Sequence, residues 1–360
     1  MANEGLSAAK KAKNDEFYTQ FHDIEKEMNA YLEYDPDVFR DKTILLPCDD
    51  PEWSNFTKYF AQNFGKLGLK KLISTSYAPN SKPKEIPYQP TLFEVESPKF
   101  DETKTQANGK IFTLTRDKTG DTVIDFEDLE WSYLEGDGDF RSDEVTALRD
   151  ESDFIITNPP FSLFREFLEW IIEGGQGFLI LGSINCITYK EVFPLIRDNK
   201  IWLGNGMGRW ISGFIVPDSY ELYGTEARLE QGRRIIATNS SLWLTNIDHG
   251  RRHEPLPLMT MEDNIKFSRH KSVKGVGYQK YDNFDAIEVP FTDAIPSDYN
   301  GVMGVPITFL DKYNPDQFEI IGCSYDYGRP KGWPAKVDMS VSIDGRNVYK
   351  RLLIRNAEKL

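Results

Sequence analysis

The chain contains the sequence Asp153-Phe154-Ile155-Ile156-Thr157-Asn158-Pro159-Pro160-Phe161, an apolar run that ends in a proline-rich loop. The apolar half predicts a buried strand, and the amphipathic pattern that begins near Ser162 predicts a helix. Because proline fixes φ and donates no backbone hydrogen bond, the loop between them is rigid and rich in acceptors. A buried strand that passes through a loop into a helix is typical of α/β folds, where ligands bind at the carboxyl ends of the strands.

The residue types of this loop suit a planar ligand that carries an exocyclic amine. An adenine amine is a poor nucleophile because its lone pair is delocalised into the ring. The Asn158 side-chain oxygen and the Pro159 carbonyl can each accept one of its hydrogens, which concentrates the lone pair on nitrogen. Pro160 keeps the loop rigid, and Phe161 can stack on a base turned out of a duplex. These four residues are the predicted catalytic residues; the alternative is a proline-rich turn that only ends a strand.

A second motif predicts a site for the methyl donor. Residues 43–47 read as a buried strand, and the segment after it turns into an aromatic helix. An acidic loop at such a strand end suits S-adenosylmethionine, which carries an ammonium and a sulfonium. The predicted cofactor-binding residues of this loop are Cys48, Asp49, Asp50 and Pro51. The alternative is a helix cap with a solvated charge, because Asp-Pro is an ordinary helix start.

A third motif, residues 134–140, precedes the catalytic strand. Asp139 can accept a hydrogen bond from the adenine amine of the cofactor, and Phe140 can cover the adenine ring. The alternative is a Gly-Asp turn that binds nothing or holds calcium. The later positions of a calcium loop are not matched, so no metal is expected here. The strand at residues 70–76 lacks the terminal acid that usually binds the ribose hydroxyls.

Together these motifs resemble those of the EcoRI-type adenine-specific DNA methyltransferases, and the resemblance runs over most of the chain. It is carried by residues 15–20, 48–51 with 54–56, 138–140, 158–161 and 304–315. The first segment resembles the motif that borders the methionine part of the cofactor, which implies that Tyr18 and Thr19 bind it. The order of the motifs, with cofactor motifs before the catalytic motif and target recognition after it, is that of the gamma class.

The resemblance implies methyl transfer from S-adenosylmethionine to N6 of adenine in a specific double-stranded DNA sequence. We therefore also expect base flipping, a role in restriction-modification or phage DNA protection, and a protein that is a monomer or a weak dimer. One alternative is a protein glutamine N-methyltransferase, which uses a similar motif. Cytosine N4 methylation is another, although such enzymes more often have Ser or Asp at the position of Asn158. A non-enzyme alternative is an inactive acidic DNA mimic or scaffold.

The charge of the chain bears on the expected DNA partner. The 360 residues carry a formal net charge of −14, which taken alone argues against DNA. The acids are concentrated between residues 94 and 153, however, and basic residues gather near 251–280 and 329–355. From the first of these regions, the residues predicted to contact DNA phosphates are Arg251, Arg252, Lys266, Arg269, Lys271 and Lys274. For each region the alternative is a solvated face.

The alternation of strands and helices predicts an α/β fold with a doubly wound, largely parallel, Rossmann-like methyltransferase sheet. Strands are expected near residues 43–47, 70–75, 124–128, 153–157 and 177–181. Residues 91–95 and 110–114 suggest an inserted hairpin within 79–121. After Leu203 glycines cluster and helical periodicity fades, which indicates a mixed, loop-rich target-recognition region that includes the run 241–245.

The expected organisation therefore has three parts. Residues 1–40 form an N-terminal arm with the cofactor-bordering motif, residues 41–205 the catalytic domain, and residues 206–360 the DNA target-recognition region. The cysteines Cys48, Cys186 and Cys323 are widely separated, make no metal-ligand spacing and fit a reducing cytoplasm. No signal peptide or long apolar span is visible, so a cytoplasmic protein without membrane insertion is expected.

Overall fold

The computed structural model describes residues 18–47, 49, 54–78, 97–118, 124, 128–216, 222, 227–236, 240–324 and 341–357. The chain divides into two compact units. Unit 1 comprises Met1–Ile184 and Gly206–Ile247, and unit 2 comprises Asn185–Asn205 and Asp248–Leu360. Residues 206–247 belong to the first unit, so the predicted recognition region, residues 206–360, does not coincide with the second unit.

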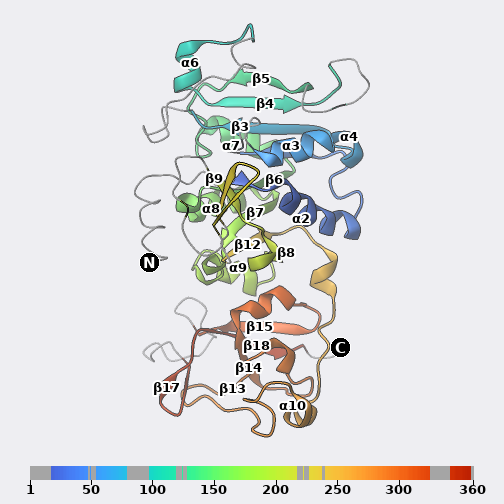
Figure 1. The fold of residues 1–360 in the computed structure, drawn as a ribbon, viewed down its shortest axis with the longest axis vertical. Helices are drawn as coiled ribbons and strands as arrows, with labels where there is room; N and C mark the ends of the chain where they lie inside the picture. The colour runs from blue at the N-terminus through green and yellow to red at the C-terminus, as the bar shows by residue number, and fades with distance from the viewer. Residues whose placement is uncertain are drawn as a thin grey trace. The chain divides into compact units, whose positions relative to one another are not determined.

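An eight-stranded mixed sheet dominates the fold (Figure 1). From edge to edge its order is β5 (Glu130–Tyr133), β4 (Lys110–Leu114), β3 (Lys71–Ser76), β2 (Thr43–Leu46), β6 (Phe154–Thr157), β7 (Gly177–Ser183), β12 (Ser241–Thr245) and β8 (Trp202–Met207). The four strands β3, β2, β6 and β7 are parallel neighbours. Antiparallel pairing surrounds this parallel centre, because β4 pairs with β3 and β5, and β12 pairs with β7.

The sequence explains the parallel centre. All four residues of β2 are buried, as are the last three of β6, and such continuous apolar runs are typical of strands covered on both faces. Four predicted strands are confirmed here as β2, β3, β6 and β7. The strand predicted at residues 124–128 lies mostly outside the described residues, and the described strand in this part of the chain is β5.

Two segments belong to the large sheet instead of where the sequence placed them. β4 was expected in a separate hairpin with residues 91–95, which lie outside the described residues; it pairs with β3 from Leu72↔Leu114 to Ser76↔Lys110. β12 was expected in the recognition region, but it pairs with β7 from Ser241↔Ser183 to Thr245↔Leu179. All five β12 residues are buried, so only an interior position in the sheet satisfies both their side chains and their backbone groups.

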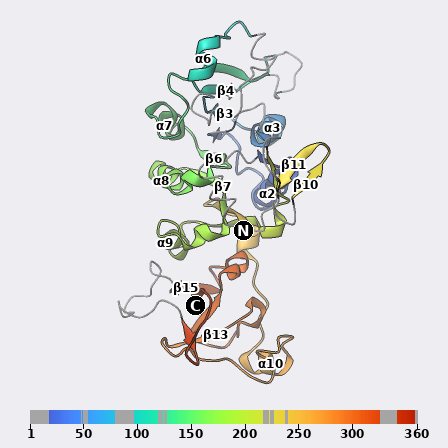
Figure 2. The ribbon, with the colours of Figure 1, turned by 60° about the vertical axis from the view of Figure 1, so that its left-hand side comes forward.

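Helices lie on both sides of the unit 1 sheet (Figure 2). On one side are α2 (Phe21–Tyr34), α3 (Asn55–Gln62) and the short α4 (Phe64–Leu67), and on the other are α7 (Asp143–Asp150) and α8 (Phe164–Gly174). Ser54 caps α3 and Ser142 caps α7 through their side-chain oxygens. α6 (Glu102–Ala107) precedes β4 and is capped by Asp101.

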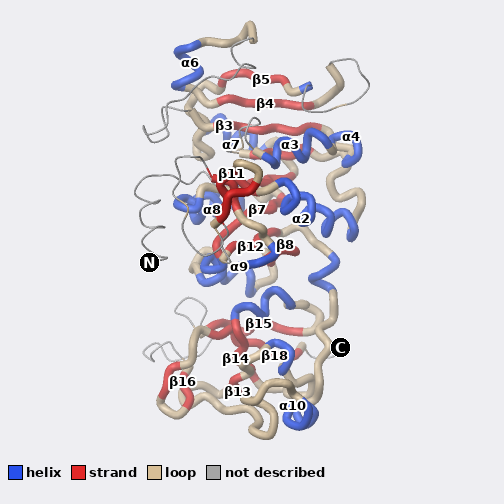
Figure 3. Tube along the Cα trace, viewed as in Figure 1, coloured by secondary structure: helices blue, strands red, loops and turns tan. Residues whose placement is uncertain are grey.

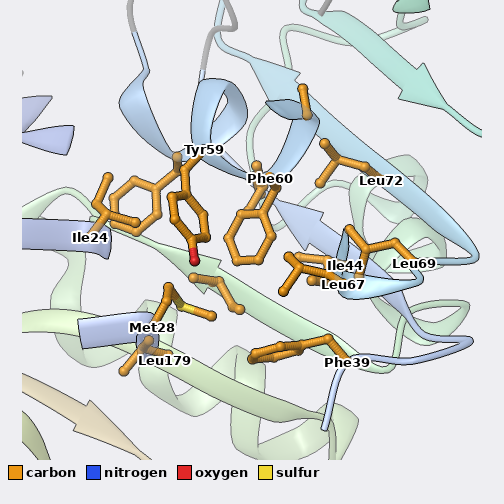
Figure 4. Packing of buried hydrophobic residues seen from close by; sticks show 14 of the residues in the cluster. Ile24, Met28, Phe39, Ile44, Tyr59, Phe60, Leu67, Leu69, Leu72 and Leu179 are labelled. Carbon is orange, nitrogen blue, oxygen red and sulfur yellow. The ribbon is translucent and has the colours of Figure 1, made fainter. Parts of the chain in front are cut away.

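The main core lies between the sheet and the α2–α3 layer (Figure 4). Tyr59 and Phe60 of α3 face Met28 of α2, Leu179 of β7 and Phe39, and all five side chains are buried. Tyr59 and Phe60 meet edge to face at 5.3 Å between ring centroids. This layer fixes α2 and α3 on the sheet, and with them the loop that connects β2 to α3.

Unit 1 also contains a small antiparallel sheet. Its order is β1 (Tyr18–Thr19), β9 (Phe214–Val216), β11 (Arg233–Ile236) and β10 (Arg228–Glu230). The described part of this unit also contains the short 3₁₀ helices η3 (Phe161–Leu163) and η5 (Gly208–Trp210). The pairing of β1 with β9 joins the predicted N-terminal motif to a segment almost two hundred residues away.

Unit 2 is a second mixed structure with its own four-stranded sheet (Figure 3). The order is β13 (Ala286–Glu288), β14 (Val302–Pro306), β18 (Arg351–Asn356) and β15 (Phe318–Cys323), and only β13 and β14 are parallel neighbours. The hairpin strands are β16 (Ser342–Ile343) and β17 (Arg346–Asn347), and the α-helices are α9 (Phe193–Arg197) and α10 (Met261–Phe267). Unit 2 also contains the 3₁₀ helices η6 (Gly250–His253), η7 (Thr292–Ala294) and η8 (Ile307–Lys312). The 3₁₀ helix η4 (Ile184–Thr188) begins at Ile184, which belongs to unit 1, and its other residues belong to unit 2. No helix in the described part of the chain is long and apolar enough to cross a bilayer.

Candidate active site

The predicted catalytic loop follows directly from β6. Thr157, the last residue of that strand, is fully buried, Pro159 is buried, and Asn158 and Phe161 are half-buried. The side-chain oxygen of Asn158 is itself buried. The Pro160 carbonyl accepts a hydrogen bond from the backbone of Leu163 at 2.9 Å, which closes the turn into η3 and α8. The loop therefore holds the asparagine in a fixed place at the strand end.

Asp49 joins the loop after β2 to this catalytic loop. Its side chain is 7% exposed and accepts a hydrogen bond from the Ser54 hydroxyl at 2.6 Å and another from the Thr157 hydroxyl. The Thr157 oxygen also lies 3.0 Å from the carbonyl of Pro47. The Asp49 carbonyl accepts from the hydroxyl of Ser74 on β3. One buried residue thus ties together the ends of three neighbouring parallel strands, β3, β2 and β6.

Three of the predicted motifs therefore meet at one edge of the sheet. Parallel strands point the same way, so the loops after β3, β2 and β6 all leave from their carboxyl ends. Asp49 and Asn158 belong to two of these loops. The segment with Asp139 lies beside the third, because the backbone of Ala78, just beyond β3, donates to the Asp137 carbonyl at 2.7 Å.

Gly138 allows that close approach. Its φ is +85°, and a Cβ at this position would lie 2.3 Å from the carbonyl oxygen of Ser76, closer than atoms can approach. A larger residue would therefore push the 134–140 segment away from the end of β3. Backbone packing alone therefore explains the glycine at position 138, without any ligand.

The motif's other two residues have partners within the protein. The Asp139 carboxylate accepts from the Arg141 guanidinium at 2.6 and 2.9 Å, and Arg141 also pairs with Glu166 of α8. The Arg141 hydrogen bonds, opposed in part by burial, lower the pKa of Asp139. Phe140 is only 2% exposed, and its ring packs edge to face on Phe167 and Trp170. Their roles toward a cofactor stay predictions.

The N-terminal motif reaches the same region through β9. Thr19 pairs with Phe214, and the Phe214 ring lies 6.2 Å from the ring of Phe161 in the catalytic loop. The Thr19 carbonyl accepts a hydrogen bond from the Asn55 side chain at 2.8 Å. The Thr19 hydroxyl oxygen is buried and has no hydrogen-bond partner among the described residues. Buried hydroxyls are almost always hydrogen-bonded, so water or a bound ligand is the expected partner of this one.

Some predicted residues are not tested by this geometry, and others were missed. Cys48, Asp50 and Pro51 lie outside the described residues. Thr157, Ser74 and Phe214 were not among the predicted site residues. The first two carried a signal, because a hydroxyl at the end of a fully buried strand needs a polar partner. Phe214 carried none, because its neighbour Phe161 is distant in the sequence.

The predicted DNA-binding residues, all in unit 2, fall into two kinds. Arg251 pairs with Asp311 at 2.6 Å, and Arg252 bonds to Asp248 and Asn199 while lying 3.8 Å over the Trp202 ring. The cavity beside these two arginines has a volume of about 20 Å³, room for a single water. The exposed side chains are Lys266, Arg269, Lys271 and Lys274, of which Lys266 forms a surface ion pair with Glu262 and Arg269 forms one with Asp293.

Comparison with known proteins adds to this geometry. The sequence family described as "Adenine-specific methyltransferase EcoRI" matches residues 5–357. The chain belongs to this family. Membership makes the protein an adenine-specific methyltransferase, as the resemblance of its motifs implied.

Two relatives are similar to this chain over most of its length. Type II methyltransferase M.EcoRI of Escherichia coli is 48% identical over 355 residues, which cover 98% of this chain and 97% of that protein. Type II methyltransferase M.MpnI of Mycoplasma pneumoniae is 32% identical over 321 residues, 88% of this chain and 85% of that protein. No solved structure gives a significant match.

Proposed function

We propose that this protein transfers a methyl group from S-adenosylmethionine to N6 of adenine within a specific double-stranded DNA sequence. The observation that carries the proposal is the position of Asn158, Pro159, Pro160 and Phe161. They follow β6 at the sheet edge where the Asp49 loop also lies, joined to it by the Thr157–Asp49 hydrogen bond. The family supports adenine as the base, and the two neighbouring loops support adjacent sites for the base and the donor.

The chain's own residues prepare the amine. The Asn158 oxygen and the Pro159 carbonyl accept its two hydrogens, which draws the nitrogen toward sp3 geometry and directs its lone pair away from the ring. Phe161 stacks on the base, which must leave the duplex to reach a loop at this edge. S-adenosylmethionine, when bound, supplies an electrophilic methyl group on a sulfonium. No strong general base is required, because the nitrogen becomes more acidic once it is methylated.

Three features support a donor site between β2 and β1. Asp49 is a buried acid at the carboxyl end of a parallel strand, and the backbone of Thr19 is held nearby through Asn55. The buried Thr19 hydroxyl has no partner within the described residues. The parallel centre with helices on both faces supports a doubly wound, Rossmann-like sheet, in which nucleotide ligands bind at this edge (Figure 2).

Unit 2 is the proposed DNA-reading part. The chain as a whole is acidic, so binding to DNA phosphates depends on where its basic side chains are exposed. Lys266, Arg269, Lys271 and Lys274 are exposed within one stretch of unit 2. Arg251 and Arg252 are instead tied to neighbours inside the unit. We assign the first group to phosphate contacts and the arginine pair to holding the unit together.

The experiment that tests the function is a product analysis. Purified protein is incubated with isotopically labelled S-adenosylmethionine and mixed-sequence duplex DNA, which is then digested to nucleosides. Label in N6-methyladenosine that is lost in Asn158→Ala is the expected result. Bound donor with label only in protein would favour glutamine methylation, and failure to bind the donor would favour a DNA mimic.

A further inference from the structure

A loop of unit 1 outside the motifs presents an exposed tryptophan. Residues 208–213 connect β8 to β9 and include η5, whose last residue is Trp210. Of the tryptophans in the described part of the chain, Trp210 is the exposed one, at 57%, whereas Trp131, Trp170 and Trp243 are buried. Single exposed aromatic side chains are ordinary on protein surfaces, and Phe267 and Tyr349 are more exposed still, so what distinguishes Trp210 is its setting.

Buried carboxylates hold this loop on α2. The second oxygen of Asp23 accepts from both the backbone and the hydroxyl of Ser212, at 3.0 and 2.7 Å. One turn further along α2, Glu27 accepts from the backbone of Gly206 at 2.8 Å. The two acids are 4% and 2% exposed. Burying two carboxylates is unfavourable unless they are satisfied, so these bonds fix both ends of the loop.

The fixed loop displays a ring with a cation beside it. Lys26, an exposed residue of α2, places its ammonium 4.0 Å over the Trp210 ring. Ile211, the next residue, is 4% exposed and anchors the chain in the core. The ring therefore projects from a rigid base, and an ammonium that can reach a phosphate lies next to it.

The loop runs into the candidate active site. Four residues after Trp210 comes Phe214, whose ring contacts Phe161 of the catalytic loop. Consecutive Cα atoms are about 3.8 Å apart, so the Cα of Trp210 lies within about 15 Å of the Cα of Phe214. A ring at that distance can reach the duplex that delivers the target base.

We infer that Trp210 stacks on the duplex beside the target adenine and compensates for the stacking lost when that base leaves the helix. The inference rests on the proposed function. Extruding a base breaks its stacking and pairing, and a neighbouring aromatic face lowers that cost. Stacking of one base on an aromatic side chain changes binding by roughly 5- to 150-fold. Asp23 and Glu27 act as positioning residues, because they hold the loop without touching DNA.

The test compares two unmethylated duplexes that carry the target site. In one the target adenine is paired, and in the other it faces an abasic position, so extrusion is easier. Trp210→Ala is expected to lower turnover at least tenfold on the paired duplex and less than threefold on the other, with donor binding unchanged. Trp210→Phe keeps most activity on both. Tyr34→Ala, an exposed aromatic at the other end of α2, is the control.

Each other outcome has a defined meaning. Equal losses on both duplexes, or wild-type turnover in Trp210→Ala, overturns the stacking role. If Trp210→Ala fails to bind the donor, the test uses tryptophan fluorescence instead. The difference between the emission of wild type and that of Trp210→Phe is the signal of the Trp210 ring. If duplex DNA reduces the quenching of this signal by acrylamide, Trp210 contacts the duplex. If the quenching is unchanged, the stacking role is overturned. A wild type that binds donor but labels no DNA overturns the proposed function itself.

Discussion

Thr157, the last residue of β6, donates its hydroxyl hydrogen to the buried side chain of Asp49 in the loop after β2. The two residues are 108 positions apart in the sequence, yet this contact joins the proposed base site to the proposed donor site. In a methyl transfer the nitrogen and the methyl carbon must meet in line, and small displacements reduce the rate steeply. The bond therefore bears on reaction geometry as well as on stability.

Removing this hydroxyl is the first prediction. Thr157→Val keeps the shape of the side chain but leaves a buried Asp49 oxygen with one donor fewer. The free energy of unfolding is expected to fall by about 1–3 kcal/mol, and turnover is expected to fall with it. Urea denaturation and the methylation assay measure the two effects. Thr157→Ser, which restores the donor, should recover most of both; a valine variant as stable and active as wild type would refute the coupling.

The second prediction concerns Asn158. Asn158→Ala removes an acceptor for the amine and leaves the Asp49 loop intact, so donor affinity should stay within about twofold while turnover falls about 100-fold, as when one oriented hydrogen-bonding group is lost. Equilibrium binding of labelled donor and single-turnover methylation separate the two quantities. Parallel losses in both would mean that the side chain belongs to the donor pocket.

Much of this sheet was predictable from local sequence, and its edges were not. β2 and β6 are short continuous apolar runs followed by loop residues, which identifies buried parallel strands. β12 has the same kind of sequence, but nothing local shows that its partner is β7, sixty residues earlier. Strand pairing at such distances is set by tertiary structure, so the local sequence did not show that residues 206–247 belong with the first unit.

The candidate site shows the same limit at the level of side chains. The proposed catalytic loop was selected because its residue types are tied to a chemistry. Asp139 was equally visible, but its bidentate contact with Arg141 was not, and Arg251 looked no different from Lys271 in a basic run. Sequence shows the charge of a side chain, whereas burial and partners decide what that charge does.

The third prediction separates these two kinds of basic residue. Replacing Lys271 and Lys274 by Ala should weaken binding to every duplex and reduce the log–log salt slope by about 0.9 for each DNA phosphate that is no longer neutralised. Arg252→Ala should instead lower the free energy of unfolding by about 0.5–1.5 kcal/mol. Asn199 loses its Arg252 donor, and Asp248 keeps its bonds from His249 and His253. Salt titrations of binding and urea denaturation distinguish the cases, and the opposite pattern would exchange the two assignments.

The fourth prediction addresses Asp139. Asp139→Ala should weaken donor binding without lowering the turnover of the saturated enzyme, because the residue is assigned to the donor's adenine. Because Arg141 lowers the pKa of this carboxyl, it stays ionised well below neutral pH, so Asp139 should add no pH dependence to donor affinity between pH 8 and pH 5. Glu166→Ala removes the other partner of Arg141 and serves as the control. Unchanged affinity in Asp139→Ala would leave the residue as a turn former.

The last prediction uses the anchor of the Trp210 loop. Burial raises the pKa of Asp23 above its ordinary value of 3.8, with Ser212, His22 and Lys26 opposing the shift. The folded state then holds the Asp23 proton more tightly than the unfolded state. Its contribution to stability is fully present below pH 3.8 and is lost as the pH rises through the higher folded pKa.

Asp23→Asn isolates that contribution, because its amide keeps an acceptor and a donor for Ser212 but does not titrate. At pH 7 the variant should be at least as stable as wild type, and its advantage should shrink as the pH is lowered toward 4. Chemical denaturation at several pH values measures the difference, in which other titrating groups largely cancel. A variant that is less stable at pH 7, or a difference that does not change with pH, would mean that Asp23 is buried as a well-compensated charge.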